Sequence, residues 1–342
     1  MPERLFTAFW NLENLFAPAN YPERPEWLAR AIRSDLRGWS TELFRHKLKQ
    51  LASIIEQLND GNGPDLLGVC EVENKFVIDE LCALLNERTA QRNYKPVHAD
   101  ATRDQRGIDT AFIHDSRTLQ VNRQEIFSHW VMRRTGTRDI TQATFVTGNG
   151  AELVVLANHW PSRSGDSGGS SSGYRAVAGE TLAYWHERIR EIKGADIAVV
   201  AFGDFNDEPF DRSITEHARA TRELRDVERA RSARFYNLSW RFLAQSALDL
   251  RGKQRSLNGT LYYRGDGNVF DQILVSQGLV KNRGAFRALS HTARIEAFPE
   301  MIDSKVTPAP IRFGLPRGNA RKNVNREGFS DHYPVSLTIE SR

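Results

Sequence analysis

Short apolar runs alternate along this chain with turns and helical patterns, and this alternation limits the possible folds more than any other feature. Helical spacing of apolar residues predicts helices over residues 41–58, 77–86 and 175–192. Many strands with few long helices favour an α/β (α+β) sandwich, in which two mainly antiparallel sheets pack face to face with helices outside. The runs that predict strands are residues 5–11, 66–71, 109–114, 119–127, 140–146, 153–158, 197–202, 269–275 and 335–339.

The length of 342 residues is enough for two domains, but no linker or internal repeat divides the chain. Residues 162–173 read SRSGDSGGSSSG and predict a flexible loop, and residues 304–328, with three prolines, predict a second one. Neither stretch separates two self-contained sets of elements. We therefore expect one domain over residues 1–342.

The composition, 40% hydrophobic and 26% charged, is that of a globular protein and excludes disordered, collagen-like and low-complexity classes. The longest apolar stretches, such as residues 197–202, are far shorter than the roughly 20 residues that a membrane span needs. The first residues lack a signal-peptide layout, and Cys70 and Cys82 do not make a disulfide framework. We expect a cytoplasmic monomer without membrane contact. Its net charge of +4 permits a polyanionic partner without requiring one.

Strand after strand ends at a short cluster of Asp, Asn, Glu or His. If strand geometry continues, Asn11 shares a face with Glu13, Glu71 with Glu73, and Asp204 with Asn206. One such cluster is usually a turn cap, but several at the edge of one core point to a site. The clusters are Asn11 to Glu13, Glu71 to Glu73, Asn158 to Trp160, Asp204 to Asn206, Asp271 before the run QILV in an antiparallel neighbour, and Ser330 to His332.

Together these clusters offer carboxylates, amides and histidines without cysteine. Oxygen ligands suit a hard cation, Mg²⁺ or Mn²⁺, and argue against structural zinc. A Mg²⁺ site needs only one or two protein carboxylates, because water and phosphate supply the other ligands. The remaining acids and histidines are then available for proton transfer and water activation.

The motifs that surround these clusters resemble those of the endonuclease/exonuclease/phosphatase superfamily, which includes DNase I, abasic-site endonucleases, neutral sphingomyelinases and inositol-polyphosphate 5-phosphatases. The resemblance spans residues 6–335 and implies a four-layer, DNase I-like α/β sandwich that needs a divalent metal. The motifs, in family order, are FWNLENLF, LLGVCEVEN, RGIDTAFI, NHWPSR, GDFND, NVFDQILVS and FSDHYPV.

The resemblance also implies the metal site. Glu71 matches the principal metal ligand, and Asn11 matches the asparagine beside the metal and the scissile phosphate. Asp331 is expected to complete the site.

The same resemblance implies roles in hydrolysis. Asp204 matches the aspartate that positions or deprotonates the attacking water, and Asn206 matches the amide that stabilises the phosphorane oxygens. His332, oriented by Asp271, is expected to contact the phosphate or to assist as a base. His159 lies where DNase I-like members keep a histidine proposed to protonate the leaving oxygen, whereas abasic-site endonucleases generally carry a tyrosine there.

Substrate contacts are expected from basic and aromatic residues near the motifs. Arg106 matches a phosphate-contacting arginine, although a salt bridge with Asp104 or Asp109 is an equal alternative. Residues 279–329 carry 10 Lys+Arg against 4 Asp+Glu and suit a phosphate backbone, unless they form only a solvated loop. Trp160 is a candidate for stacking on a base, or else a core residue. Further candidates are Asn74, Arg163, Arg321 and Lys322.

These residues favour a nuclease that cleaves DNA or RNA by in-line attack of an activated water. One alternative is a phosphatase or phosphodiesterase acting on a phosphoinositide, sphingomyelin or another small phosphate ester. The 5-phosphatase branch usually has a tryptophan-cysteine-aspartate-arginine cluster where this chain has VFDQIL, which disfavours that branch. A non-catalytic nucleic-acid-binding member is the other alternative, and the presence of every expected catalytic residue type disfavours it.

Overall fold

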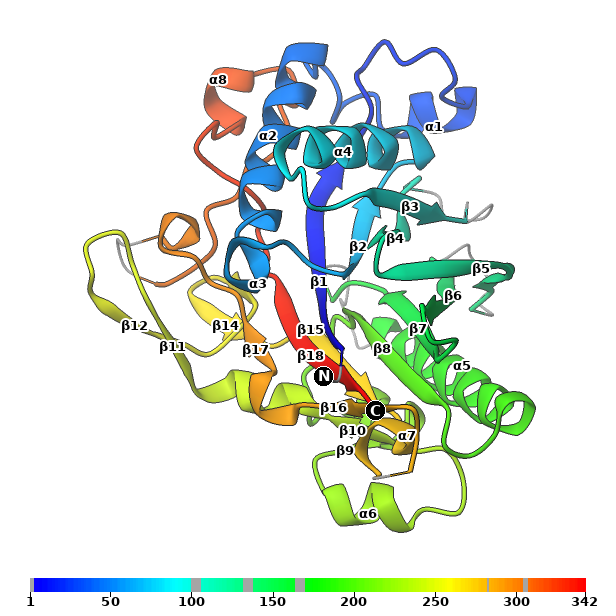
Figure 1. Cartoon of the computed structure of the whole chain (residues 1–342). Coiled ribbons are helices and arrows are strands. Elements are labelled where there is room, and N and C mark those ends of the chain that lie inside the picture. Colours follow the sequence, from blue (N-terminus) through cyan, green and yellow to red (C-terminus); the bar gives the residue numbers. More distant parts are fainter. Residues whose placement is uncertain (1–2, 100–105, 132–137, 164–169, 282, 304–306) are drawn as a thin grey trace.

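Two seven-stranded sheets face each other at the centre of the molecule (Figure 1). The computed structural model describes residues 3–99, 106–131, 138–163, 170–281, 283–303 and 307–342. Helices α2 and α4 cover the outer face of one sheet and α5 that of the other, so the described chain has four layers. This arrangement confirms the predicted α/β sandwich.

The first sheet has the order β16-β18-β1-β2-β4-β3, with β17 also paired to β18, and the second has the order β5-β6-β7-β8-β15-β10-β9. Most pairs are antiparallel, but β1 with β2, β7 with β8, and β9 with β10 are parallel. The strands of the first sheet are β1 (Arg4–Leu15), β2 (Leu66–Val72), β3 (Tyr94–His98), β4 (Asp109–Asp115), β16 (Phe286–Ala288), β17 (Arg294–Ile295) and β18 (Val335–Ser341). Those of the second sheet are β5 (Leu119–His129), β6 (Ile140–Thr147), β7 (Glu152–His159), β8 (Ala198–Asp204), β9 (Ala220–Thr221), β10 (Phe235–Asn237) and β15 (Asp271–Val275).

Two separate hairpins and several helices complete the described chain. The hairpins are β11 (Gln245–Leu248) with β12 (Gln254–Leu257), and β13 (Leu261–Tyr263) with β14 (Asp266–Asn268). The α-helices are α1 (Glu26–Ala31), α2 (Thr41–Ile55), α3 (Leu58–Gly61), α4 (Lys75–Arg88), α5 (Ser170–Lys193), α6 (Leu224–Arg229), α7 (Gln277–Val280) and α8 (Ala320–Asn323). A π-helical turn (Ser213–His217) and three 3₁₀ segments (Leu238–Ala244, Ser290–Thr292 and Pro299–Met301) connect them. None of the described helices is long and apolar enough to cross a membrane.

Aromatic side chains fill the space between the two sheets. The ring of Phe202 lies 5.5 Å from that of Phe9 and 6.1 Å from that of Phe112, and Phe112 meets Phe145 edge-on at 5.6 Å. Gly68 makes room for this cluster, because a Cβ at that position would lie 2.0 Å from Cε2 of Phe202. Close packing of this kind fixes how the two sheets face each other.

Helix α2 illustrates how the sequence determines an outer layer. Its N-cap is Ser40, whose Oγ accepts a hydrogen bond from the backbone N of Leu43 at 3.2 Å. The apolar stripe that predicted this helix is buried, including Phe44 and Leu51. The helix ends at Ile55, and residues beyond it form the short α3.

Each predicted strand and long helix is present, with ends shifted by a few residues. One expectation outside these elements needs correction. Residues 170–173 of the expected loop at 162–173 begin α5, and residues 164–169 lie outside the described part of the chain. Of residues 304–328, the first three lie outside the described part. In the remainder of the stretch, the side chains of Phe313 and Leu315 are buried.

Strand directions bring the polar clusters to one edge. Since β1 runs parallel to β2, and β7 to β8, the ends of these four strands lie at the same end of their sheets. Residue His159 pairs with Asp204 at the end of β8, and antiparallel β15 begins with Asp271 opposite the same Asp204. The antiparallel neighbour expected for Asp271 is therefore β8.

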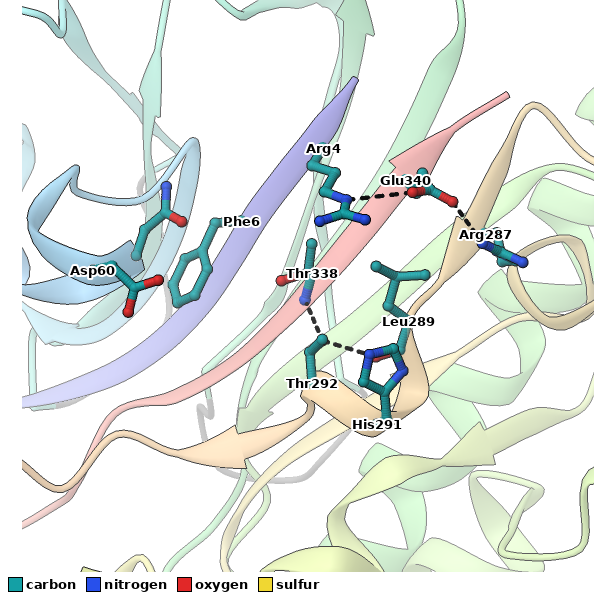
Figure 2. A pocket seen from close by; sticks show the side chains of 10 residues that line it. Arg4, Phe6, Asp60, Arg287, Leu289, His291, Thr292, Thr338 and Glu340 are labelled. Atoms are coloured by element: carbon teal, nitrogen blue, oxygen red, sulfur yellow. Dashed lines mark hydrogen bonds and ion pairs between the residues drawn. The ribbon is translucent and has the colours of Figure 1, made fainter. Parts of the chain in front are cut away.

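A cavity of about 340 Å³ lies at the opposite end of the first sheet, near the chain termini (Figure 2). Glu340 there accepts hydrogen bonds from Arg4 at 3.3 Å and from Arg287 at 2.6 Å. Thr338 donates its backbone N–H to Oγ1 of Thr292 at 2.9 Å. These contacts tie β1, β16 and β18 together, and the cavity is separate from the polar edge described next.

Candidate active site

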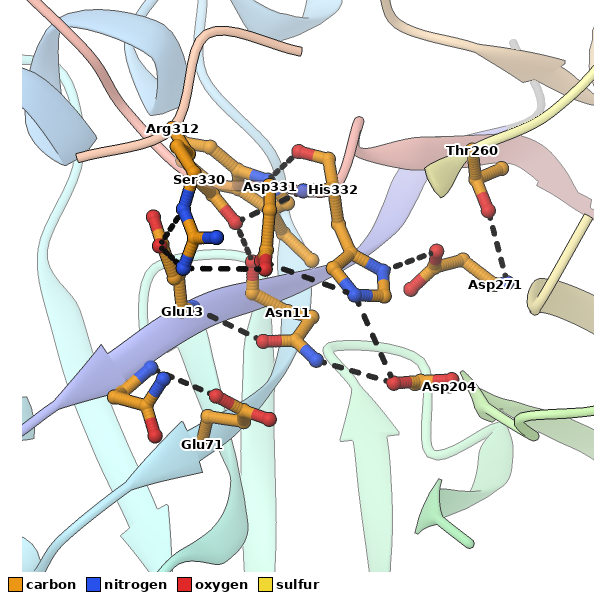
Figure 3. Close-up of polar contacts among 12 residues, drawn as sticks. Asn11, Glu13, Glu71, Asp204, Thr260, Asp271, Arg312, Ser330, Asp331 and His332 are labelled. Atoms are coloured by element: carbon orange, nitrogen blue, oxygen red, sulfur yellow. Dashed lines mark hydrogen bonds and ion pairs between the residues drawn. The ribbon is translucent and has the colours of Figure 1, made fainter. Parts of the chain in front are cut away.

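A chain of polar contacts joins the two sheets at their common edge (Figure 3). Asn11 at β1 donates from Nδ2 to Oδ2 of Asp204 at 3.1 Å, and the same Oδ2 lies 3.9 Å from Nε2 of His332. Nδ1 of His332 contacts Oδ2 of Asp271 at 2.7 Å. Four residues that are far apart in the sequence therefore form one buried cluster, as the family resemblance implied.

Glu71 reaches this cluster from the end of β2. Its Oε2 accepts a hydrogen bond from the backbone N of Asn14 at 2.8 Å, and its Oε1 lies 3.6 Å from Nε2 of His159. The same Nε2 lies 3.7 Å from Oδ2 of Asp204. His159 therefore lies between Glu71, the carboxylate expected to bind the metal, and Asp204, the carboxylate expected to position the water.

Backbone strain concentrates at this edge. Glu13, Asn14, Glu71 and Asn206 have φ values of 50°, 55°, 61° and 51°, in the left-handed region that residues other than glycine rarely adopt. Such conformations persist only where the surroundings enforce them, and they cluster at functional sites.

This strain also overturns the expected alternation of side chains. The pairing register shifts between Asn11 and Leu15 and again between Cys70 and Val72, so the end of each strand departs from strand geometry. Glu73 does not join Glu71 but forms a buried ion pair with Arg24 at 2.7 Å. The condition for a shared face, continued strand geometry, is therefore not met at these strand ends.

Asn206 also departs from strand geometry, because it lies in a turn after β8. Its backbone N donates to Oδ1 of Asp204 at 3.0 Å, and its Nδ2 donates to the carbonyl of Trp160 at 2.9 Å. A turn stabilised by an aspartate side chain, rather than a continued strand, therefore holds the amide beside the carboxylate.

The two histidines have opposite electrostatic environments. Burial opposes a charge on His332, but the carboxylates of Asp271, Asp204 and Asp331 raise its pKa well above the usual value. Burial lowers the pKa of His159 well below the usual value, and nearby Arg138 adds to that effect. These shifts favour an imidazolium at His332 and a neutral imidazole at His159, and the general-acid role expected of His159 stays a prediction.

Two acidic residues of the cluster have raised pKa values, so their neutral forms are more favoured than usual. Burial raises the pKa of Asp204 to about 6, although His332 opposes the rise. Burial and the carboxylate of Glu13 raise the pKa of Asp331 to about 7, with a further contribution from Glu71. Burial is the largest cause of both rises, and at Asp331 the neighbouring carboxylates add to it.

The oxygen ligands gathered at this edge fit a hard divalent cation. Glu71 and Asp331 would hold such an ion by their carboxylates, with Asn11 beside it. Among the residues that the structure describes, no three His, Cys, Asp or Glu side chains gather as a metal cage. A Mg²⁺ ion does not require one, since it keeps several water ligands and uses one or two protein carboxylates.

Glu13 and Arg312 belong to this edge, although sequence reasoning gave them no role. The buried carboxylate of Glu13 accepts hydrogen bonds from Nε of Arg312 at 2.8 Å and from the backbone N of Phe313 at 2.9 Å and of Gly314 at 3.1 Å. Lys47, buried on α2, donates to the backbone carbonyl of Glu13. We call this set of contacts the Glu13 latch. Only the position of Glu13 in the first polar cluster signalled it.

The Glu13 latch places part of the basic stretch beside the site. Nη2 of Arg312 lies 3.9 Å from Oδ2 of Asp331, and Arg312 lines a cavity with Asn14 and Arg317. Arg321 and Lys322 are exposed on α8, and no contact with the polar cluster is found for them among the described residues. Arg312, rather than Arg321 or Lys322, is therefore the residue of the basic stretch that lies beside the site.

The other expected substrate contacts have mixed outcomes. Arg106 is exposed and donates from Nη2 to Oδ1 of Asn14 at 3.1 Å. The backbone N of the same Asn14 donates to the Glu71 carboxylate. The side chain of Asn74 caps α4 by accepting from the backbone N of Val77 at 3.2 Å.

Two candidates are structural instead. Trp160 is 1% exposed and donates from Nε1 to Oδ1 of Asn158 at 3.1 Å, so it cannot stack on a base. Arg163 donates to the carbonyl of Asn206 at 2.9 Å and to Oδ1 of Asp207 at 2.8 Å. It supports the turn that carries Asn206, and these contacts occupy the guanidinium that was expected on the substrate.

Comparison with known structures supports the fold. The chain is similar to an endonuclease/exonuclease/phosphatase family protein from Bacteroides thetaiotaomicron, with 14% identity, coverage of 100% of this chain and 96% of the other, and a TM-score of 0.56. It is also similar to truncated Caenorhabditis elegans TDP2 (14% identity, coverage 99% and 98%, TM-score 0.51) and to the B. thetaiotaomicron mannosyl-6-phosphatase (16%, 98% and 99%, 0.52).

No curated protein matches the chain. The model of the Endonuclease/Exonuclease/phosphatase family matches residues 6–341, nearly the whole chain and all of the polar edge. Its members include nucleases and phosphatases. On the strength of that match, this chain belongs to the endonuclease/exonuclease/phosphatase family.

Proposed function

We propose that this chain is a divalent-metal-dependent phosphodiester hydrolase whose substrate is nucleic acid. The observation that carries the proposal is the placement of Asp204 between the charged pair His332–Asp271 on one side and Glu71 on the other. A carboxylate that accepts a proton and a fixed cation that meets developing negative charge are what in-line hydrolysis requires.

Glu71 and Asp331 hold Mg²⁺ or Mn²⁺ in this proposal, and Asn11 lies beside the ion. When bound, the ion neutralises charge on the phosphate and so lets a nucleophile approach. Burial, with the carboxylates of Glu13 and Glu71, raises the pKa of Asp331 to about 7, and a cation there would relieve this unfavourable environment, which supports the assignment.

Asp204 orients the attacking water and accepts its proton. Its pKa of about 6 is close to what a general base needs near neutral pH. The imidazolium of His332 and the amide of Asn206 then stabilise the charge that builds on the phosphorane oxygens. Asp271 keeps His332 protonated and fixes its orientation.

Exposed arginines on two sides of the edge support nucleic acid as the substrate class. Arg106 lies against Asn14 on one side, and Arg312 lies against Glu13 on the other. In this proposal both guanidiniums contact phosphates that flank the one being cleaved. The alternative is a small phosphate ester, and the likeness to a mannosyl-6-phosphatase keeps it in view.

The test is a panel of plasmid, single-stranded DNA, RNA, sphingomyelin and inositol phosphates, each with Mg²⁺, Mn²⁺ or EDTA. We expect metal-dependent cleavage of nucleic acid and its loss in Asp204→Asn and His332→Ala, with circular dichroism unchanged. Asp226→Asn, an exposed carboxylate on α6, is the matched control and should keep full activity. Cleavage of only the lipid or inositol substrates would overturn the nuclease assignment.

A further inference from the structure

A groove of about 1060 Å³ lies on the side of α1. Its volume is at the upper end of what ligand sites in proteins usually offer. Residues from the segment before α1, from α1 itself, from the start of α4 and from the start of β4 line it. Those that the argument uses are Tyr21, Trp27, Leu28, Asn74, Phe76 and Gly107.

Flat aromatic surfaces form the walls of this groove. The rings of Tyr21 and Phe76 are stacked, with centroids 4.8 Å apart and an angle of 24° between their planes. Phe44 of α2 stacks behind Phe76 at 6.0 Å and supports it from the core. The side of α1 contributes Trp27, which is 50% exposed. A large aromatic side chain left half exposed on a groove wall is a surface on which a planar ligand can stack.

Neighbouring residues link the rim of the groove to the catalytic edge. Gly107 (φ 59°) packs on α1 so closely that a Cβ there would lie 2.4 Å from Cδ1 of Leu28. The preceding residue, Arg106, donates to Asn14, and the backbone N of Asn14 donates to the Glu71 carboxylate. Arg106 therefore stands at the boundary between the groove and the position expected for the scissile phosphate.

Charge pairing inside the groove favours an uncharged occupant. Glu73 is neutralised by the buried Arg24, and Asp79 pairs with Lys75 at 2.7 Å. Glu23 accepts a hydrogen bond from the hydroxyl of Tyr21 at 3.0 Å. Because Arg24 and Lys75 are engaged by these carboxylates, the groove offers little attraction to a phosphate, and a phosphorylated substrate is expected to enter it with its uncharged part while its phosphate stays at Arg106.

We propose that this groove binds the nucleobase of a nucleotide next to the scissile phosphate, with the base stacked on Trp27. The proposal rests on the proposed function and deepens it by naming the part of the substrate that is recognised. A planar base matches the aromatic walls, and the amide of Asn74 at the rim can reach a base edge. A lipid chain does not match a groove whose rim carries paired charges.

The test compares two strands that differ only in their bases. One is a single-stranded thymidine pentamer, and the other has the same backbone with abasic tetrahydrofuran units. Trp27→Ala should lower kcat/KM on the thymidine strand by about 5- to 150-fold, the range expected for one stacked base. It should leave cleavage of the abasic strand unchanged. Trp27→Phe, which keeps an aromatic face, should recover most of the loss, and Tyr184→Ala, an exposed aromatic on α5, is the matched control.

A binding measurement separates this proposal from the proposed function. Fluorescence anisotropy of both labelled strands in EDTA reports affinity without turnover, and Trp27→Ala should weaken only the thymidine strand. Equal losses on both strands, or no loss on either, would overturn the base site even if hydrolysis is confirmed. If the wild type cleaves no phosphodiester yet binds the thymidine strand through Trp27, the hydrolase proposal fails and the base site stands.

Discussion

Nδ1 of His332 lies 2.7 Å from Oδ2 of Asp271, and this contact fixes a positive charge opposite Asp204. Asp271 is fully buried and pairs with Asp204 in neighbouring strands, so the sheet itself sets the distance between the base and the imidazolium. A rigid support of this kind is how enzymes place a cation where charge develops.

Asp271→Asn is predicted to lower turnover on a phosphodiester by roughly 10- to 100-fold, the loss typical of removing a supporting carboxylate. The amide keeps the hydrogen bond but removes the charge that raises the pKa of His332. The folded-state pKa of His332 then falls, so the alkaline limb of the pH–rate profile should move to lower pH. Measuring kcat/KM from pH 5 to 10 checks this, and an unmoved limb would remove His332 as the titrating cation.

The Glu13 latch yields a stability prediction. Glu13→Ala removes an acceptor for Arg312, Phe313 and Gly314 and leaves two buried backbone N–H groups without their partner. Hydrogen bonds to a charged group contribute about 1.5–3 kcal/mol each, partly offset by water. We expect the free energy of unfolding in urea to fall by about 2–4 kcal/mol.

A double-mutant cycle distinguishes the latch from a general loss of packing. Arg312→Ala alone should cost less, because its side chain is 62% exposed and solvent screens its charge. If the effects of Glu13→Ala and Arg312→Ala simply add, the two side chains are not coupled and the latch is wrong as described.

The sequence predicted the framework of this site because strand direction and polarity are local signals. The positions of Asn11, Glu71 and Asp204 after apolar runs, and of Asp271 before one, were enough to expect a shared edge. The family motifs then added roles for these residues that spacing alone does not give.

The failures arose where tertiary contacts decide. Trp160 and Arg163 follow a strand, as the residues of the polar cluster do. Trp160, however, is buried against Phe205, and Arg163 forms an ion pair with Asp207. Nothing in the local sequence distinguishes these partners from a substrate. The groove beside Trp27 was missed for the same reason, since residues before α1 have no periodic pattern and acquire their shape from α4.

Metal binding should be measurable without turnover. A cation held by Glu71 and Asp331 relieves repulsion in the folded state only, so Mg²⁺ should raise the thermal midpoint relative to EDTA. Glu71→Gln should remove most of this rise, whereas Asp226→Asn on α6 should keep it. Differential scanning fluorimetry at several Mg²⁺ concentrations provides the measurement, and an equal rise in Glu71→Gln would place the ion elsewhere.

Stability should fall in mild acid because of a buried histidine away from the site. His114 on β4 is 2% exposed and lies against Phe145, and its burial lowers the pKa to about 4. The unfolded chain keeps the ordinary pKa of about 6.5, so between these values it binds more protons than the folded chain. His114 therefore makes the free energy of unfolding roughly 3 kcal/mol larger above pH 6.5 than near pH 4, and this difference is lost progressively as the pH falls between these values.

Urea unfolding at pH 7.5 and pH 5.0 gives the slope, and His114→Phe keeps an aromatic ring in place without a titrating group. The variant should lose less stability than the wild type between the two pH values. Some loss should remain, because His186, stacked on Phe235 at 3.8 Å, also has its pKa lowered by burial, to about 3. An identical loss in the variant and the wild type would show that His114 does not titrate in this interval, and the acid sensitivity would then come from other groups.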